Sequence, residues 1–213
     1  MSNYAVVDLE MCKVPRAKRT EDYPYKCEII QIGVILLNSE FNIVNEFKSY
    51  VSPDNGVVDT YIHKLTGISA EDVAHAPKLV EVLRDLVNWL PEDAVMIEWS
   101  DNDENQLRRE IEAKQLSESE LLPLLCEWVD CQKMFGDKLG IDKVYRLSEA
   151  LNISNIYYDD GAHDALVDAR NTAKLFRKIQ TETVLKLNPY YSCNEKPLTT
   201  GISLGALIAG LAI

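Results

Sequence analysis

Two apolar stretches separated by only five residues constrain the fold of this chain more than any other feature. Glu28–Leu37 and Ile43–Val51 have the β-branched, apolar composition of strands, and the short connection Asn38–Asn42 between them predicts an antiparallel hairpin. A third strand is expected at Tyr4–Leu9, a short apolar run followed by a loop with two prolines. Its composition predicts a strand buried in the centre of a sheet.

Helical patterns follow the hairpin and alternate with further strands. Lys78–Leu90 has the i, i+3, i+4 apolar spacing of a helix and ends at Pro91, after a short helical stretch that Gly67 ends. Further helices are expected at Asn102–Lys114, Tyr145–Leu151 and Ala165–Leu185, and further short strands at Ala94–Trp99 and Glu127–Cys131. This alternation predicts an α/β domain with a mixed sheet covered by helices on both faces.

Length and composition predict one globular domain. The chain has 213 residues, 46% of them hydrophobic and 26% charged, which is enough to bury a sizeable core. We expect the domain to span residues 1–185 and residues 186–213 to form a C-terminal tail packed on it. The apolar run Ile202–Ile213 in this tail is shorter than the roughly 20 residues of a membrane-spanning helix. We therefore expect no membrane contact, with a membrane anchor as the alternative.

Cysteines and charge indicate where the protein works and how it meets its partners. Five cysteines without paired C-x-x-C spacing, and no leader before Tyr4, predict a reduced, cytoplasmic protein with free thiols. A formal net charge of -12 argues against holding duplex nucleic acid on a broad basic face, because such binding rests on many phosphate contacts. Any nucleic-acid contact is therefore expected to be local. The basic cluster Lys13, Arg16, Lys18 and Arg19 is one candidate, and a solvated loop is its alternative.

Acidic residues at the end of the first expected strand are candidates for catalysis. Asp8 and Glu10 are two positions apart, so their side chains point to the same face of the strand. Burying two like charges together is costly unless a cation neutralises them, and carboxylate oxygens suit magnesium or manganese. The alternative is a strand end that turns into solvent.

A second acidic element, EWSDNDENQL, begins at Glu98, where a strand is expected to meet a helix. Asp101 followed by Glu104 fits a helix-capping box, which is a purely structural role for Asp101. Asp103 would lie in the first helical turn, where a carboxylate interacts favourably with the helix dipole. We therefore prefer Asp103 as the metal-linked residue, with Asp101 as the alternative.

A third element, GAHDALVDA, begins at Gly161 and opens the last long helix. His163 and Asp168 are five positions apart, or about 140° around a regular helix, so they share a site only if His163 lies before the helix. Gly161 supplies the backbone freedom for that placement. A histidine can take a proton from water near neutral pH, although an ordinary surface histidine is the alternative.

Taken in this order, the three elements resemble those of the DEDDh 3'-5' exonucleases, which share an RNase H-like fold. The nearer likeness is to the Eri-type exoribonuclease branch and its bacterial relatives, over about residues 4–180. It is carried by VVDLEM, CEIIQIGVILL, YIHKLTGISAEDV, EWSDNDENQL, VDCQKMF and GAHDALVDARNTA. The resemblance implies an α/β, RNase H-like mixed five-stranded sheet flanked by helices.

The resemblance also implies a reaction and the residues that perform it. The expected activity removes nucleotides one at a time from the 3' end of RNA or single-stranded DNA, as nucleoside 5'-monophosphates. Asp8, Glu10, Asp103 and Asp168 would bind two Mg²⁺ or Mn²⁺ ions, and His163 would be the general base. Two such ions, about 4 Å apart, bind the scissile phosphate, activate water and stabilise the leaving oxygen.

A substrate-binding set is implied by the same resemblance: Leu9, Met11, His63, Leu65 and Thr66. Leu65 would stack on the last base, with a core leucine as the alternative. Met11 stands where many relatives have a small or hydroxyl side chain, so contacts to the terminal sugar would differ.

Three other functions stay open. One is a DNA exonuclease or proofreading subunit with the same metals and the same base. Another is a catalytically silent module that holds a nucleic-acid end or a protein, and the third is a metal-dependent phosphatase acting on small molecules. A preference for RNA needs a group that reads the 2'-hydroxyl, and no motif identifies one.

Overall fold

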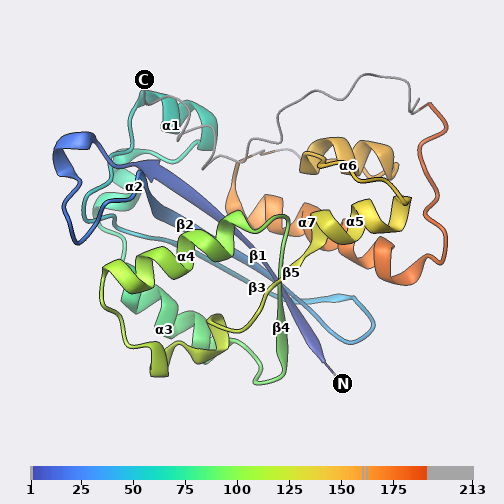
Figure 1. Ribbon diagram of the computed structural model, residues 1–213, viewed down its shortest axis with the longest axis horizontal. Helices are drawn as coiled ribbons and strands as arrows, with labels where there is room; N and C mark the ends of the chain where they lie inside the picture. The colour runs from blue at the N-terminus through green and yellow to red at the C-terminus, as the bar shows by residue number, and fades with distance from the viewer. Residues whose placement is uncertain (1, 160, 162, 191–213) are drawn as a thin grey trace.

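A sheet of five strands lies at the centre of the part of the chain that the structure describes (Figure 1). This computed structural model describes residues 2–159, 161 and 163–190. The strands are β1 (Asn3–Lys13), β2 (Cys27–Leu37), β3 (Ile43–Tyr50), β4 (Ala94–Glu98) and β5 (Val129–Asp130). Their order is β3-β2-β1-β4-β5, with β1, β2 and β3 antiparallel and β4 and β5 parallel to β1. The mixed five-stranded sheet that the sequence predicts is confirmed.

Helices cover both faces of this sheet, as the alternating pattern predicts. They are α1 (Thr60–Thr66), α2 (Ala70–Ala74), α3 (Leu79–Trp89), α4 (Asn102–Ala113), α5 (Cys131–Leu139), α6 (Leu147–Ile153) and α7 (Ala165–Thr181). Short 3-10 turns are η1 (Arg16–Lys18), η2 (Glu118–Glu120) and η3 (Leu122–Leu124). In Figure 1, α3 and α4 lie together on the left, and α5 and α6 lie beside α7 on the right.

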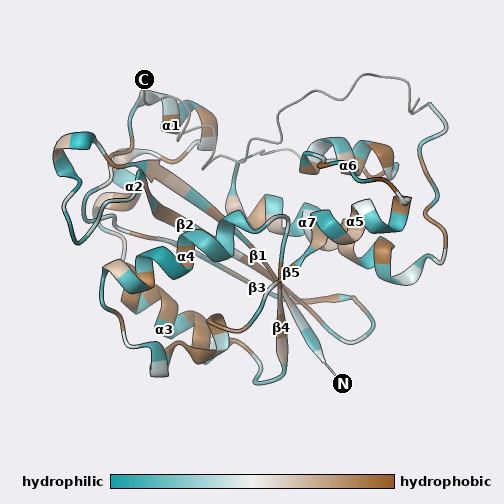
Figure 2. Cartoon of the chain, viewed as in Figure 1, coloured by the Kyte–Doolittle hydropathy of each residue, from teal (hydrophilic) through white to brown (hydrophobic). Residues whose placement is uncertain are grey.

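The central strand β1 separates two hydrophobic cores, because its side chains alternate between the two faces of the sheet. Val7 packs in the core shared with α3 and α4. Val6 packs in the second core, shared with α5, α6 and α7. Figure 2 shows hydrophobic residues along the central strands and on the helix faces turned toward them. Asp8 and Glu10 are two and four positions after Val6, so their side chains point to the same face as Val6, which α7 covers.

Four helices differ from the sequence-based expectation. Helix α2 has no counterpart in it, and α6 spans Leu147–Ile153 instead of Tyr145–Leu151. The last helix ends at Thr181 instead of Leu185. Helix α5 fills a stretch where the sequence predicts only the end of a short strand. The Asp130 side chain caps α5 by accepting a backbone N–H at 2.8 Å, and Gly140 ends it in the left-handed conformation at φ 67°. Local capping thus starts and ends a helix whose apolar pattern is weak.

The described part of the C-terminal tail returns to the domain. Leu185 is buried in the second core, and the Asn188 backbone N–H donates to the Ile153 carbonyl at 2.8 Å. Residues 191–213, which include Ile202–Ile213, lie outside the described residues, so packing of the whole tail and the boundary at residue 185 stay predictions. Among the residues that the structure describes, no helix has the length and apolar character needed to cross a membrane.

Candidate active site

Strand β1 brings two carboxylates to the face under α7. Asp8 and Glu10 lie opposite Gly33 and Gln31 of β2, and they share one face as their i, i+2 spacing predicts. Glu10 is only 2% exposed, and its Oε2 atom has no hydrogen-bond partner among the described residues. A buried carboxylate oxygen without a partner is costly unless a cation binds it. Glu10 therefore has the environment of a metal ligand.

The start of α4 contributes a third carboxylate. Strand β1 pairs with β4 over Asn3–Val6, so within the described part of the chain this pairing stops before Asp8. The Leu9 N–H donates instead to the Asp103 carboxylate. Asp103 is 8% exposed, whereas Asp101 is exposed at the N-cap of α4. The geometry therefore favours Asp103 over Asp101 as the acidic residue of the site.

The capping box expected at Asp101 is wrong, because a different carboxylate takes that role. The Asp101 side chain makes no capping hydrogen bond. The buried Glu98 carboxylate, at the end of β4, accepts from the Glu104 N–H at 2.9 Å. Burial raises the pKa of Glu98 to about 9. Glu98 thus fixes the first turn of α4, which carries Asp103.

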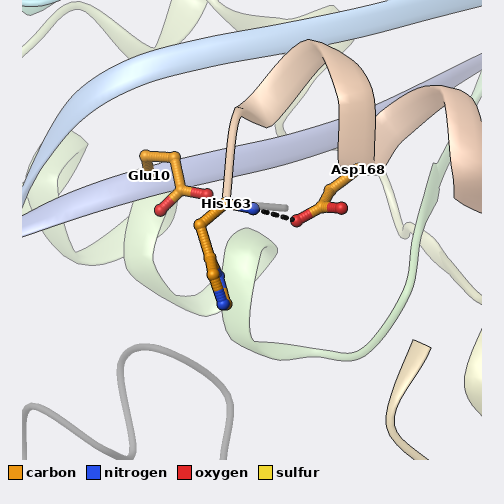
Figure 3. Close-up of side chains that lie close together, drawn as sticks. All are labelled: Glu10, His163 and Asp168. Atoms are coloured by element: carbon orange, nitrogen blue, oxygen red, sulfur yellow. Dashed lines mark hydrogen bonds between the residues drawn. The ribbon is translucent and has the colours of Figure 1, made fainter. Parts of the chain in front are cut away.

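His163 and Asp168 meet at the start of α7, in the arrangement that the sequence predicts. The Asp164 side chain caps the helix by accepting N–H groups of the first turn. His163 precedes this cap in the left-handed conformation at φ 65°, and its N–H donates to Asp168 Oδ2 at 3.0 Å. Figure 3 shows the imidazole pointing away from α7, with Glu10 on one side and Asp168 on the other. A ring nitrogen of His163 and carboxylate oxygens of Glu10 and Asp168 lie within 4.8 Å of one another.

Asp8 and Asp103 lie outside this tight group but within electrostatic reach of it. Burial raises the pKa of Asp8 well above its usual value, and the neighbouring charges of Asp103, Asp168 and Glu10 raise it further. Burial likewise raises the pKa of Glu10 and of Asp168, and it raises the pKa of Asp103 to about 8. Four carboxylates that resist ionising together form an environment suited to cations.

Contacts with β2 and β3 set the position of α7. A Cβ atom on Gly33 would lie 2.3 Å from the backbone of Ala165, so only glycine lets the helix approach this closely. Next along β2, Gln31 Oε1 accepts from the Ala165 N–H at 2.7 Å. From β3, Lys48 Nζ forms an ion pair with Asp164 at 2.5 Å. The first turn of α7 is therefore held by groups from both strands.

Two predicted substrate-binding residues, Leu9 and Met11, have buried side chains. They are 4% and 3% exposed and pack in the core shared with α3 and α4, away from the face of Asp8 and Glu10. Only their backbone is thus available to a substrate. The expectation that the Met11 side chain alters contacts to the terminal sugar is corrected for this reason.

The other three predicted substrate-binding residues lie on α1. Thr66 is buried, and its hydroxyl donates to the Ile62 carbonyl and accepts from the Ile68 N–H, which ties the end of the helix. His63 is exposed, with Nδ1 at 3.1 Å from the Ile68 carbonyl oxygen. Leu65 is half-buried and belongs to neither hydrophobic core. The base-stacking role of Leu65 stays a prediction.

Three further residues, which the sequence alone did not identify, support the site: Gln31, Lys48 and Tyr158. Gln31 is fully buried, and a polar side chain among the apolar residues of a predicted strand was a signal available for it, although Glu28 on the same strand gives the same signal. The Tyr158 hydroxyl donates to Asp168 Oδ1. Tyr158 lies ten positions before Asp168 in an irregular segment, where no periodic pattern points to it. Lys48 is one of two charged residues on β3, and nothing in the sequence of this strand singles it out.

Comparison with known proteins assigns this arrangement to a family. The exonuclease family model RNase_T matches residues 5–176. The chain belongs to this exonuclease family. A solved structure described as "3'-end specific recognition of histone mRNA stem-loop by 3'-exonuclease" matches with a TM-score of 0.70 and 22% identity, over 88% of this chain and 66% of that chain. The RNase H-like exonuclease fold that the sequence predicts is thereby confirmed.

Curated relatives of the chain are named exoribonucleases. The chain is 31% identical to ERI1 exoribonuclease 2 of Danio rerio, over 73% of this chain and 32% of that protein. It is 27% identical to 3'-5' exoribonuclease 1 of Homo sapiens, over 76% of this chain and 49% of that protein. The chain thus spans about a third to a half of the length of these relatives. The predicted likeness to the Eri-type branch is confirmed.

Proposed function

We propose that this chain is a two-metal-ion 3'-5' exonuclease that releases nucleoside 5'-monophosphates from the 3' end of RNA or single-stranded DNA. The observation that carries the proposal is the meeting of carboxylates from β1, α4 and α7 beside the His163 ring. Hydrolysis of a phosphodiester needs positive charge near the phosphate and a base near the attacking water. Membership of the exonuclease family supports the same reaction.

We assign Asp8, Glu10, Asp103 and Asp168 as ligands of two Mg²⁺ or Mn²⁺ ions. Their raised pKa values and the unpartnered Glu10 Oε2 support this assignment, because a bound cation would stabilise the ionised carboxylates. A set of oxygen donors suits both Mg²⁺ and Mn²⁺. When bound, such ions act as Lewis acids for the phosphate and lower the pKa of water. A solved structure that shares the fold, with a TM-score of 0.61, is described as the Mg2+ and Mn2+ bound form of S. pombe Pop2p.

We assign His163 as the general base. Its ring nitrogen lies within 4.8 Å of carboxylate oxygens of Glu10 and Asp168, so a water between these groups is within reach of the imidazole. The hydrogen bond from its own N–H to Asp168 fixes the backbone from which the ring projects. This hydrogen bond therefore links the position of the proposed general base, His163, to that of the proposed metal ligand, Asp168.

We propose RNA as the preferred substrate, because the curated relatives are named exoribonucleases. Helix α1 would seat the terminal nucleotide through His63, Leu65 and the nearby backbone. The net charge of -12 leaves room only for local contacts, and the basic cluster beginning at Lys13 is one of them. In this cluster the Arg19 guanidinium also donates to the Val14 carbonyl, so it helps to order the loop.

We also propose that the protein works in the reducing cytoplasm. Among the residues that the structure describes, four cysteines are present as free thiols, three buried and one exposed: Cys12, Cys27, Cys131 and Cys126. Free thiols are typical of compartments in which glutathione and thioredoxin keep cysteines reduced. Cell fractionation measures the location, and recovery from an oxidising compartment would contradict it.

A cleavage assay tests the proposed activity directly. The protein is incubated with 5'-labelled single-stranded RNA and with DNA of equal sequence, in Mg²⁺, Mn²⁺ or chelator. We expect a ladder that shortens by one nucleotide at a time from the 3' end of RNA and disappears in chelator. A ladder on DNA alone would favour the DNA-directed alternative. Intact RNA and DNA together with measurable binding of 3' ends would favour the silent module.

We expect the metal-free protein to lose stability as the pH rises from about 6 to about 9. The site carboxyls have raised pKa values, which reach about 8 for Asp103, so the folded state holds protons that the unfolded state has released. This contribution is complete below the unfolded pKa values, which are about 4, and is lost progressively as the pH rises through the folded pKa values. Divalent ions bind the ionised carboxylates, so they should stabilise the protein more at the higher pH.

Melting temperatures at about pH 6 and about pH 9, each measured with chelator and with Mn²⁺, show how the stabilisation by Mn²⁺ depends on pH. Glu110 is an internal control, because burial raises its pKa to about 7. Its ion-pair partner is Lys114, which also pairs with Glu28 and Asp54, and none of these residues belongs to the candidate active site. A Glu110→Gln variant should change the pH dependence and leave the Mn²⁺ effect unaltered. Equal stabilisation by Mn²⁺ at both pH values would contradict the assignment of the carboxyls with raised pKa values to the metal site.

We expect Gly33→Ala to lower stability and activity together. The added methyl group collides with the backbone of Ala165, so α7 must shift, and overpacking of this kind costs about 1–3 kcal/mol. Displacing reacting groups by about 1 Å lowers a rate about 100-fold. Ile153→Val is the matched control, because Ile153 is fully buried at the end of α6 and the loss of one methyl group there costs about 0.5–1.5 kcal/mol. Full activity in a destabilised Gly33→Ala protein would show that the start of α7 tolerates the shift.

A further inference from the structure

The Asp168 carboxylate is held by two donors that come from outside the helix bearing it. The Tyr158 hydroxyl donates to Oδ1, and the His163 backbone N–H donates to Oδ2 at 3.0 Å. Each oxygen of a carboxylate can accept more than one bond, so both oxygens keep lone pairs available for cations. The two donors therefore fix the orientation of the carboxylate without blocking it.

The aromatic ring of Tyr158 is itself anchored. The ring packs against the hydrophobic core shared with α5, α6 and α7. This packing fixes the ring, so the hydroxyl group reaches Asp168 from a defined position. The next residue ties the same segment to α7: the Asp159 N–H donates to Asn171 Oδ1 at 3.1 Å, and the Asp159 carboxylate pairs with Lys174 at 2.6 Å. These contacts give Tyr158 one well-defined position beside Asp168.

We propose that Tyr158 is a positioning residue for the metal site, which it serves by orienting the Asp168 carboxylate through its hydroxyl. The inference rests on the proposed function and adds a residue that the four-carboxylate, one-histidine site does not include. Hydrogen-bond partners behind a ligand set its orientation and basicity, and removing one lowers metal affinity or activity about 10- to 100-fold. Tyr158 touches neither the reacting water nor the nucleic acid in this role.

The test is Tyr158→Phe, with Tyr157→Phe as its matched control. Tyr157 is the adjacent tyrosine and is 91% exposed, so its hydroxyl has no part in the site. We expect the Mn²⁺ concentration for half-maximal cleavage to rise at least about tenfold in Tyr158→Phe, with an unchanged KM for RNA. Tyr157→Phe should match the wild type in both quantities. A Tyr158→Phe protein with an unaltered Mn²⁺ requirement would overturn the proposal, even if its melting temperature falls.

Binding of Mn²⁺ to the protein without RNA, followed by electron paramagnetic resonance, separates this proposal from the proposed function. Weaker Mn²⁺ binding in Tyr158→Phe supports the positioning role whether or not the wild type cleaves RNA. A wild type that binds Mn²⁺ without cleaving ends the nuclease proposal alone, and one that binds no Mn²⁺ ends both. If Tyr158→Phe fails to fold, Asp159→Asn loosens the same segment, and its Mn²⁺ affinity should fall about twofold. Unchanged affinity in that variant would then overturn the proposal.

Discussion

Asp103→Asn should lower the rate of RNA cleavage at least about 1,000-fold, whereas Asp101→Asn should leave it within about twofold. Asp103 is buried, accepts a hydrogen bond from the Leu9 N–H and interacts electrostatically with the other carboxylates of the site. Asp101, in contrast, is exposed at the N-terminal end of α4. Asparagine keeps an oxygen that can accept from Leu9 and removes only the negative charge. The two variants therefore differ in the property that a metal ligand needs.

Single-turnover cleavage rates at saturating Mn²⁺ provide the measurement for this pair. A melting temperature in chelator shows whether Asp103→Asn stays folded, and we expect no loss near pH 9, because a buried carboxyl with a raised pKa has been removed. A large loss of rate in Asp101→Asn with normal cleavage by Asp103→Asn would reassign the third ligand. If both variants lowered the cleavage rate equally and only slightly, no carboxylate at the start of α4 would be a metal ligand.

His163→Asn should lower the cleavage rate about 100- to 10,000-fold, the usual contribution of a general base. Asparagine suits this test because it tolerates the left-handed backbone conformation that His163 adopts at φ 65°. The backbone N–H that donates to Asp168 remains in the variant. His75→Asn is the matched control, because His75 is an exposed residue that follows α2.

Added imidazole should restore part of the rate in His163→Asn and leave His75→Asn unaffected. The dependence of the rate on Mn²⁺ distinguishes a base from a ligand, since the ring nitrogen lies close to the carboxylates of Glu10 and Asp168. An unchanged Mn²⁺ requirement supports the base. A loss that saturating Mn²⁺ fully repairs would make His163 a ligand instead.

The strand part of the site follows from the sequence because it depends on local geometry. Two carboxylates two positions apart on a strand must share a face, and Asp8 and Glu10 do so. The hairpin of β2 and β3 follows from the same kind of reasoning. His163 and Asp168 needed one further argument, that the histidine precedes the helix, and the structure places it there.

Competition between side chains explains what the sequence could not predict. The capping pattern at Asp101 and Glu104 is sound locally, but Glu98 reaches the same N–H from a buried strand end. The closeness of α7 to β2 depends on Gly33, and a single glycine in an apolar strand does not reveal which helix will cross it. Tyr158 acts across an irregular segment, where only the folded chain brings its hydroxyl to Asp168.

The two halves of the site should differ in local stability, because β1 lies inside the sheet while His163 and Tyr158 precede α7. The amides of β1 that bond to β2 are buried, so their deuterium exchange should require opening of the whole domain. Tyr158 and Asp159 are held to α7 by side-chain contacts, so their amides should exchange faster than those of β1. The carboxylates of Asp8 and Glu10 would then be the more persistent half of the site, because they belong to the strand whose opening requires the whole domain.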